Sequence, residues 1–223
     1  YATTADNNIL DFGDTDDMTI SGWFNRDTAT TADVIVAKRN SVGFGESGYI
    51  VDIQTTDELV FRVSDGTDEY KLTSATTFTS TGWHHFAIVW DESSASTTQM
   101  YIDGRLDVAT ASGTIASIGN LDYTAAFRIG ASSTATDPFD GKIDEVRVYD
   151  RALSPSEITD LYKLTVPTAV DTGLVGYWAF GADDIRSTLV SDRSGARNTG
   201  TLVNAPTKTI GRIGQAFNFV SAS

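Results

Sequence analysis

The stretch GKIDEVRVYDRALSPSEITDLY, residues 141–162, decides the fold because it passes directly from a strand into a helix. Its first half alternates polar and apolar side chains, which is the period of a β-strand. Ser154 can then cap a helix, Pro155 fits the first helical position and Glu157 completes a capping box. We therefore predict a strand followed by one short helix at about residues 154–162.

Short alternating runs of the same kind recur along the chain, separated by Gly, Asp, Asn, Ser and Thr. Antiparallel strands can be joined by tight turns, whereas parallel strands need helical crossovers that this sequence lacks. We therefore predict an all-β fold in which two antiparallel sheets form a sandwich. The predicted strands lie at residues 18–24, 33–39, 49–54, 58–64, 70–74, 83–91, 99–104, 127–132, 141–150, 174–180, 199–203 and 215–220.

The composition excludes several classes of protein. Sixteen Lys and Arg against thirty Asp and Glu give a formal net charge of −14, which disfavours binding to nucleic acid or to an acidic membrane. Cysteine is absent, so neither a disulfide framework nor a thiolate metal site can form. No apolar run approaches the roughly 20 residues that span a bilayer, so we expect no membrane insertion. Residues 1–20 do not resemble a signal peptide, and we expect any export signal outside this segment.

Residues 141–162 resemble the closing signature of laminin-G-like, concanavalin A-like domains, which are common in bacterial extracellular proteins. The resemblance implies that the sandwich is a jelly roll at a cell surface or outside the cell. It extends over nearly the whole chain. The other similar stretches are DMTISGWF (17–24), TGWHHFAIVWD (81–91), MYIDGRL (100–106), GLVGYWAF (173–180), DRSGARNTGTLVN (192–204) and GRIGQAFNF (211–219).

These segments stand in a different order from that of the family. Residues 173–223 resemble the family's opening, residues 1–163 resemble its middle and end, and residues 163–172 form a linker. Joining Ser223 to Tyr1 restores the family order. We therefore expect the whole chain to be a single, circularly permuted domain, cut out of register from an array of tandem repeats. The alternative is that the last segment begins a second, unfinished domain, which would leave its aromatic side chains exposed.

The sequence contains little that would support catalysis. A retaining glycoside hydrolase needs two carboxylates about 5 Å apart, typically on alternate residues of one strand. Asp144 and Glu145 are adjacent, so we expect them to point to opposite faces. For His84 and His85, packing within a strand is favoured over a role as a base or a metal ligand. We predict that the chain is not an enzyme.

Asp144 needs a partner for its charge. We expect it to share a face of the strand with Val146 and Val148, and an unpaired carboxylate on an apolar face is costly. Lys142 on the same face or backbone amides could supply the partner, and so could a metal ion.

The family resemblance implies that this ion is a structural Ca²⁺, held where the closing strand meets the opening segment. Calcium binds about six to eight oxygens, many of them backbone carbonyls. We expect Asp144 and Asp192 as carboxylate ligands, with Gly195 and Asn198 as carbonyl donors. The alternative, which the sequence supports equally, is that Asp192 only caps an Asx turn.

Three aromatic residues in predicted loops are candidates for ligand binding, because sugars stack on aromatic rings. They are Phe44, Tyr123 and Phe139, and each could instead anchor its loop in the core. The resemblance implies a non-catalytic module that binds a carbohydrate or another component of a cell surface. The alternative is a structural spacer, one repeat of an adhesin-like array that contacts neighbouring repeats and binds no small ligand.

Overall fold

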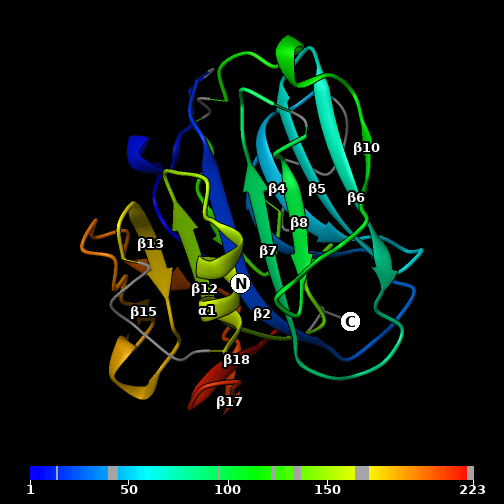
Figure 1. Cartoon of the computed structure of the whole chain (residues 1–223). Helices are drawn as coiled ribbons and strands as arrows, with labels where there is room; N and C mark the ends of the chain where they lie inside the picture. Colours follow the sequence, from blue (N-terminus) through cyan, green and yellow to red (C-terminus); the bar gives the residue numbers. More distant parts are fainter. Residues whose placement is uncertain are drawn as a thin grey trace.

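The computed structural model describes residues 1–13, 15–39, 45–94, 96–121, 124–132, 137–163 and 171–219. These residues form two antiparallel sheets that face each other across one main core (Figure 1). The first sheet contains, in spatial order, β10 (Thr110–Ser112), β6 (Glu69–Thr77), β5 (Glu58–Asp65), β4 (Ser47–Ile53), β3 (Asp33–Lys38), β11 (Arg128–Ile129), β1 (Ala2–Thr3), β16 (Gly200–Leu202), β15 (Leu189–Val190) and β14 (Ile185–Arg186). The second contains β17 (Thr207–Ile210), β18 (Gln215–Phe219), β12 (Gly141–Tyr149), β2 (Met18–Arg26), β7 (His84–Trp90), β8 (Gln99–Ile102) and β9 (Arg105–Leu106), and β13 (Leu174–Trp178) also pairs with β12.

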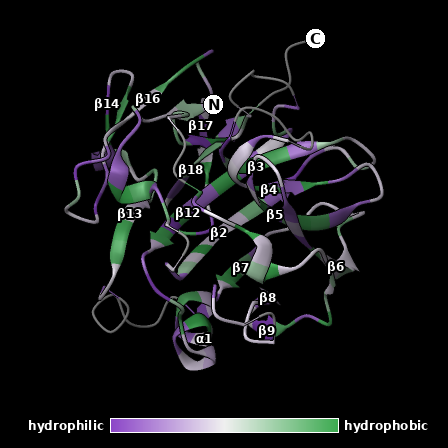
Figure 2. Ribbon diagram, turned by 90° about the horizontal axis from the view of Figure 1, so that it is seen from above, coloured by the Kyte–Doolittle hydropathy of each residue, from purple (hydrophilic) through white to green (hydrophobic). Residues whose placement is uncertain are grey.

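The core follows from the alternation of side chains along the strands. On β5, Leu59, Phe61 and Val63 are fully buried and belong to the main core. Figure 2 shows hydrophobic and hydrophilic segments alternating along the central strands. The predicted all-β sandwich of two sheets is therefore confirmed. The sequence did not predict β1, β9, β10, β14, β15 and β17, because strands of two to four residues are too short for a period to be recognised.

Helical structure is short in the described part of the chain. The α-helix α1 (Pro155–Lys163) is accompanied by three short 3-10 helices, η1 (Asn8–Leu10), η2 (Ile115–Ser117) and η3 (Ala182–Asp184). Ile158 and Leu161 of α1 are buried in a second cluster with residues of β7, β8 and β12. The helix therefore covers the outer face of the second sheet, where Figure 1 shows it in front of β12.

The predicted capping box of α1 is confirmed. The Glu157 N–H donates to the Ser154 Oγ at 3.4 Å, and the Ser154 N–H donates to the Glu157 carboxylate at 2.8 Å. Hydrogen bonding from Arg151 contributes most to lowering the pKa of Glu157 to about 2. The start of the helix is thus determined locally, as the sequence indicates.

Residues 171–219 contribute strands to both sheets. β13 and β18 pair with β12, and β16 pairs with β1. The Trp178 ring stacks on Phe127 with centroids 4.9 Å apart, and Phe180, Phe217 and Phe219 are also buried in the main core. These aromatic side chains are therefore covered by the rest of the same chain.

Both ends of the described chain lie beside the turn at Gly130, which follows β11. Ala2 pairs with Ile129 in the first sheet. Phe219, in the second sheet, lies so close to Gly130 that a Cβ atom there would be 2.7 Å from its ring. Gly130 has a φ of 85°, which favours glycine. The circular order of the family segments stays a prediction, because most of the expected linker and the Ser223 end lie outside the described residues.

Candidate functional site

The three aromatic candidates do not form a binding platform in the described structure. Phe44 and Tyr123 lie outside the described residues. Phe139 is fully buried, and its ring meets that of Phe24 edge to face at 6.3 Å. Because a buried ring offers no face to a sugar, the prediction of a ligand contact at Phe139 is wrong. Phe139 anchors its loop in the core.

The turn at residues 192–198 is organised by the Asp192 carboxylate. Its Oδ1 accepts from the backbone N–H groups of Tyr177 at 2.9 Å and Ser194 at 2.8 Å. Its Oδ2 accepts from the Ser194 hydroxyl at 2.8 Å and the Asn198 backbone N–H at 2.9 Å. The bond to the backbone N–H two residues ahead is that of an Asx turn. Asp192 therefore makes an Asx turn.

The other predicted calcium ligands are also engaged as parts of this turn. The Asn198 backbone carbonyl accepts from the Trp178 Nε1 at 3.0 Å, and its side-chain Oδ1 accepts from Asn7 at 2.6 Å. Gly195 has a φ of 91°, so its backbone conformation explains why glycine stands there.

Asp144 is fully buried, but on the face opposite to the expected one. It pairs with Trp23 of β2 on the outer face of the second sheet, whereas Val146 and Val148 point into the main core. A bulge follows Asp144, and Glu145 within it has a φ of 54°. The extra residue of the bulge changes which face of the sheet the following side chains point to. The expectation that Asp144 shares a face with the two valines is therefore wrong.

Backbone amides hold the Asp144 carboxylate. Its Oδ2 accepts from the N–H groups of Arg212 at 2.8 Å and Ile213 at 3.0 Å, and its Oδ1 accepts from the next residue's N–H at 2.9 Å. Burial raises the pKa of Asp144 to about 7, although the hydrogen bonds lower it. Lys142, the other partner considered, pairs instead with Asp27 at 3.1 Å.

These residues do not fit a shared Ca²⁺ ion as they are arranged. Asp144 and Asp192 have no hydrogen-bonding partner in common, and amide or hydroxyl donors already point at their oxygens. Among the residues that the structure describes, no three His, Cys, Asp or Glu side chains are grouped to hold a metal. Calcium binding at this place stays a prediction.

The histidines and Glu145 occupy structural positions. Burial lowers the pKa of His85 to about 3, so its ring is neutral at physiological pH. The His84 Nδ1 lies 3.0 Å from the Asp103 Oδ2. The Glu145 carboxylate accepts from Arg147 at 2.6 Å. The structural interpretation of the two histidines therefore agrees with their surroundings.

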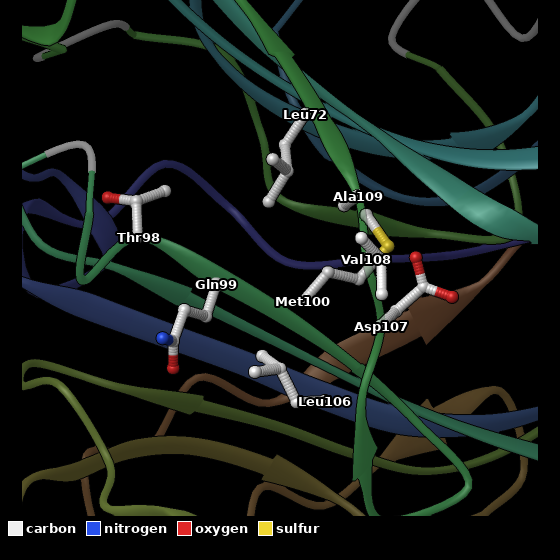
Figure 3. Close-up of a pocket in the computed structure, with 8 residues that line it drawn as sticks. All are labelled: Leu72, Thr98, Gln99, Met100, Leu106, Asp107, Val108 and Ala109. Atoms are coloured by element: carbon white, nitrogen blue, oxygen red, sulfur yellow. The ribbon is translucent and has the colours of Figure 1, made fainter.

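A hollow of about 260 Å³ opens where the chain crosses from the second sheet to the first, between β9 and β10 (Figure 3). We call it the crossing hollow. β8 and the edge strand β9 of the second sheet contribute to it, as does β6 of the first sheet. Its lining residues are Leu72, Thr98, Gln99, Met100, Leu106, Asp107, Val108 and Ala109.

The crossing hollow combines a buried apolar floor with an exposed apolar rim. Leu72 and Met100 are 4% and 0% exposed, whereas Leu106 and Val108 are 57% and 85% exposed. Figure 3 shows Met100 and Val108 side by side. The sequence analysis missed this site. The one signal for it is that Leu106 and Val108 stand in an otherwise polar turn.

Hydrogen bonds fix the polar side chains of the crossing hollow. The Asp107 carboxylate accepts from the Ala75 N–H at 2.7 Å and from the Thr76 hydroxyl at 2.6 Å, which ties the crossing segment to β6. The Gln99 Oε1 accepts from the Tyr101 hydroxyl at 2.7 Å. This bond orients the Gln99 amide, which Figure 3 shows pointing away from Met100 and Val108. The hollow is therefore preformed, with the fixed Asp107 carboxylate beside its apolar surface.

Two ion pairs lie on the outer face of the first sheet, and the sequence analysis also missed them. Arg39 pairs with Glu69 at 3.2 Å, and Arg62 pairs with Asp52. Burial raises the pKa of Asp52 to about 6, against the opposing effect of Arg62. Each guanidinium has a carboxylate beside it, so the charges compensate one another. This arrangement is a structural network.

Several solved structures share this fold. A protein of Bacteroides ovatus ATCC 8483, described as a candidate carbohydrate-binding protein, aligns at 19% identity with a TM-score of 0.67, over 99% of this chain and 58% of that one. The CBM40 of the Ruminococcus gnavus IT-sialidase aligns at 17% identity with a TM-score of 0.50, over 66% of this chain and 83% of that one. The binding domain of botulinum neurotoxin serotype D/C VPI 5993 aligns at 15% identity with a TM-score of 0.50, over 70% of this chain and 38% of that one. At these identities the likeness shows the fold.

This chain spans only 58% of the length of the Bacteroides protein. A search of curated proteins finds no match. No helix within the described ranges is long and apolar enough to cross a membrane.

Sequence comparison with protein families gives a more direct assignment. The sequence model described as the concanavalin A-like lectin/glucanases superfamily matches residues 1–159, which is more than half of the chain. The match runs from β1 through β12 into α1, and it therefore includes most strands of both sheets. By this match, in agreement with its two-sheet fold, the chain belongs to the concanavalin A-like lectin/glucanases superfamily.

Proposed function

We propose that this chain is a non-catalytic module that binds a carbohydrate or another component of a cell surface, and that it works outside the cell or on its surface. The structural neighbours support the ligand class. The R. gnavus CBM40 has been solved bound to α2,3- and α2,6-sialyllactose. A botulinum neurotoxin type C structure, with a TM-score of 0.50, is described by the dependence of cell entry on interaction with two ganglioside molecules.

The crossing hollow is the observation that carries this proposal. A sugar ring has an apolar face and an edge of hydroxyl groups, so its site needs an apolar surface with a few fixed polar groups beside it. Met100 and Val108 supply the apolar surface, and the Asp107 carboxylate, which hydrogen bonds from β6 hold in place, supplies a fixed acceptor beside it. The volume of about 260 Å³ suits a small group such as one terminal sugar.

The surroundings of the carboxylates support a non-catalytic role. Asp144 receives three backbone amides, and Glu145 receives Arg147. A glycoside hydrolase needs its two carboxylates open to the substrate on either side of the scissile bond. These two are instead committed to bonds within the protein.

A glycan array that includes sialylated lactose tests the proposal, and two aspartate substitutions locate the site. Val108→Asp places a charge at the rim of the hollow and should weaken binding about tenfold or more, equivalent to about 1.4 kcal/mol. Ile210→Asp is the matched control, because Ile210 is 83% exposed on β17, on the edge strand at the far side of the second sheet. It should leave binding unchanged.

Two outcomes would contradict the proposal. An array that shows no glycan binding would favour the structural spacer. Equal loss of binding in Val108→Asp and Ile210→Asp would place the site elsewhere than in the crossing hollow.

A further inference from the structure

Lys38, the last residue of β3, points into the protein. It pairs with Tyr49, whose ring lies in the main core, and its side chain is 1% exposed. Its Nζ lies 2.7 Å from the Asp6 Oδ1, 2.5 Å from the Asp11 Oδ1 and 3.1 Å from the Ala125 carbonyl oxygen. A buried ammonium is thus surrounded by oxygens from two other segments, the one that contains Asp6 and Asp11 and the one that contains Ala125.

Charge compensation explains why this lysine can be buried. An unpaired ammonium in a protein interior is strongly disfavoured, whereas one with matched oxygen acceptors is tolerated. The two carboxylates exceed the charge of the ammonium by one. Asp6 remains 34% exposed, so water screens part of this excess, whereas Asp11 is 8% exposed and depends more on Lys38.

The oxygens around the ammonium have the chemistry of a metal site. Carboxylates and backbone carbonyls are the ligands that Ca²⁺ prefers, at about 2.3–2.6 Å, and the Nζ–oxygen distances begin at 2.5 Å. The Lys38 ammonium already occupies this position, so the surrounding oxygens accommodate a positive charge. We propose that Lys38 is the resident cation of this junction, and that Asp6, Asp11 and the Ala125 carbonyl form a site that accepts Ca²⁺ when the lysine side chain is removed.

The junction also reaches the C-terminal part of the chain. Asp6 and Asp11 flank η1, which Asn7 caps through a bond from the Ile9 N–H at 3.2 Å. The Asn7 amide donates to Asn198 at 2.6 Å. The Lys38 ammonium therefore stabilises the meeting point of these segments without a bound metal, at a place distinct from the predicted calcium ligands Asp144 and Asp192.

Removal of the side chain tests the proposal. Lys38→Ala should lower the melting temperature, and millimolar Ca²⁺ should raise it again. At a Ca²⁺ concentration about one hundred times Kd, we expect a rise of about 5–10 °C. Lys142→Ala is the matched control, because it removes a partly exposed ion pair with Asp27. Neither this variant nor the wild type should respond to Ca²⁺ or to a chelator.

Chemical restoration of the ammonium gives a second test. The chain contains no cysteine, so Lys38→Cys introduces a single thiol. In the unfolded chain its thiolate displaces bromide from 2-bromoethylamine, which forms a carbon–sulfur bond and leaves a side chain nearly identical to lysine. The alkylated protein should refold with nearly the wild-type melting temperature and no Ca²⁺ response. The unalkylated protein should respond to Ca²⁺.

The proposal is overturned if Ca²⁺ affects Lys38→Ala and Lys142→Ala equally, or if alkylation leaves the Ca²⁺ response in place. It is also overturned if the unalkylated Lys38→Cys protein folds at no Ca²⁺ concentration while the alkylated protein folds. A chelator that lowers the melting temperature of the wild type but not of Asp11→Asn would show a metal already at the junction, which contradicts a resident ammonium.

Discussion

The Lys38 junction and the Asp144 turn both bury carboxylates where distant segments meet, but they compensate the charge differently. At Lys38 an ammonium lies between Asp6 and Asp11. At Asp144 three backbone N–H groups orient the carboxylate, yet burial still raises its pKa to about 7. Amide dipoles thus hold a buried carboxylate in place without offsetting its loss of hydration, whereas an ammonium supplies a full opposite charge.

The largest expected effect comes from removing the ammonium charge of Lys38 while keeping most of its unbranched side chain. Lys38→Met should lower the free energy of unfolding by about 3–5 kcal/mol, because the buried Asp11 carboxylate loses the ammonium beside it. Urea denaturation measures this loss. Adding Asp11→Asn should recover more stability than adding Asp6→Asn, because Asp11 is 8% exposed and Asp6 is 34% exposed. Equal recovery would contradict the burial argument.

The second prediction concerns pH dependence at Asp144. Its pKa is raised from 3.8 to about 7, so between these values the folded protein keeps a proton that the unfolded chain has released. The contribution of Asp144 to the free energy of unfolding should therefore fall as pH rises from about 4 to about 7, by no more than about 4 kcal/mol. The difference in the free energy of unfolding between the wild type and Asp144→Asn, measured by denaturation at several pH values, should show this fall.

Comparison with the wild type isolates this effect. Asp52, whose pKa burial raises to about 6, and His85, whose pKa burial lowers to about 3 with the opposite effect on stability, contribute in both proteins and cancel in the difference. Asp27→Asn, at a surface carboxylate that is 43% exposed, should keep the wild-type profile. A profile of Asp144→Asn that matches the wild type would show that Asp144 does not titrate in this range.

The smallest expected effect is at Asp192. Backbone amides hold it, as they hold Asp144, and the Ser194 hydroxyl adds a bond within the turn. Asp192→Ala should lower the free energy of unfolding by about 1–3 kcal/mol, because several donors lose their acceptor. From the observed bonds, we expect the same loss with and without a chelator. If the chelator lowers the melting temperature of the wild type and Asp192→Ala no longer responds, the predicted structural Ca²⁺ is supported.

Local features of the fold were accessible from the sequence. Strands such as β2 and β5 carry a clear alternation, and the capping box at Ser154 and Glu157 involves residues three positions apart. The candidate sites were less accessible. Leu72 and Val108 meet in the crossing hollow only because β6 and the crossing segment lie together, and no local pattern brings them there.

Asp144 shows where a local rule fails. The period of a strand assigns faces correctly only while no residue is added, and the bulge at Glu145 reverses the facing. Phe139 shows a related limit, because a phenylalanine in a polar loop has the same local sequence whether its ring is exposed or buried.

The sequence by itself determined that this chain is an acidic, all-β sandwich with a short capped helix, and its motifs identified the superfamily. These properties depend on composition and on neighbouring residues, so they can be read along the chain. The tertiary structure alone decided the partners of Lys38, because Asp6 lies 32 positions and Ala125 lies 87 positions away. When the two sheets close over one core, these oxygens come together around the ammonium. Burial then strengthens the interactions between the charges, because little water is left to screen them.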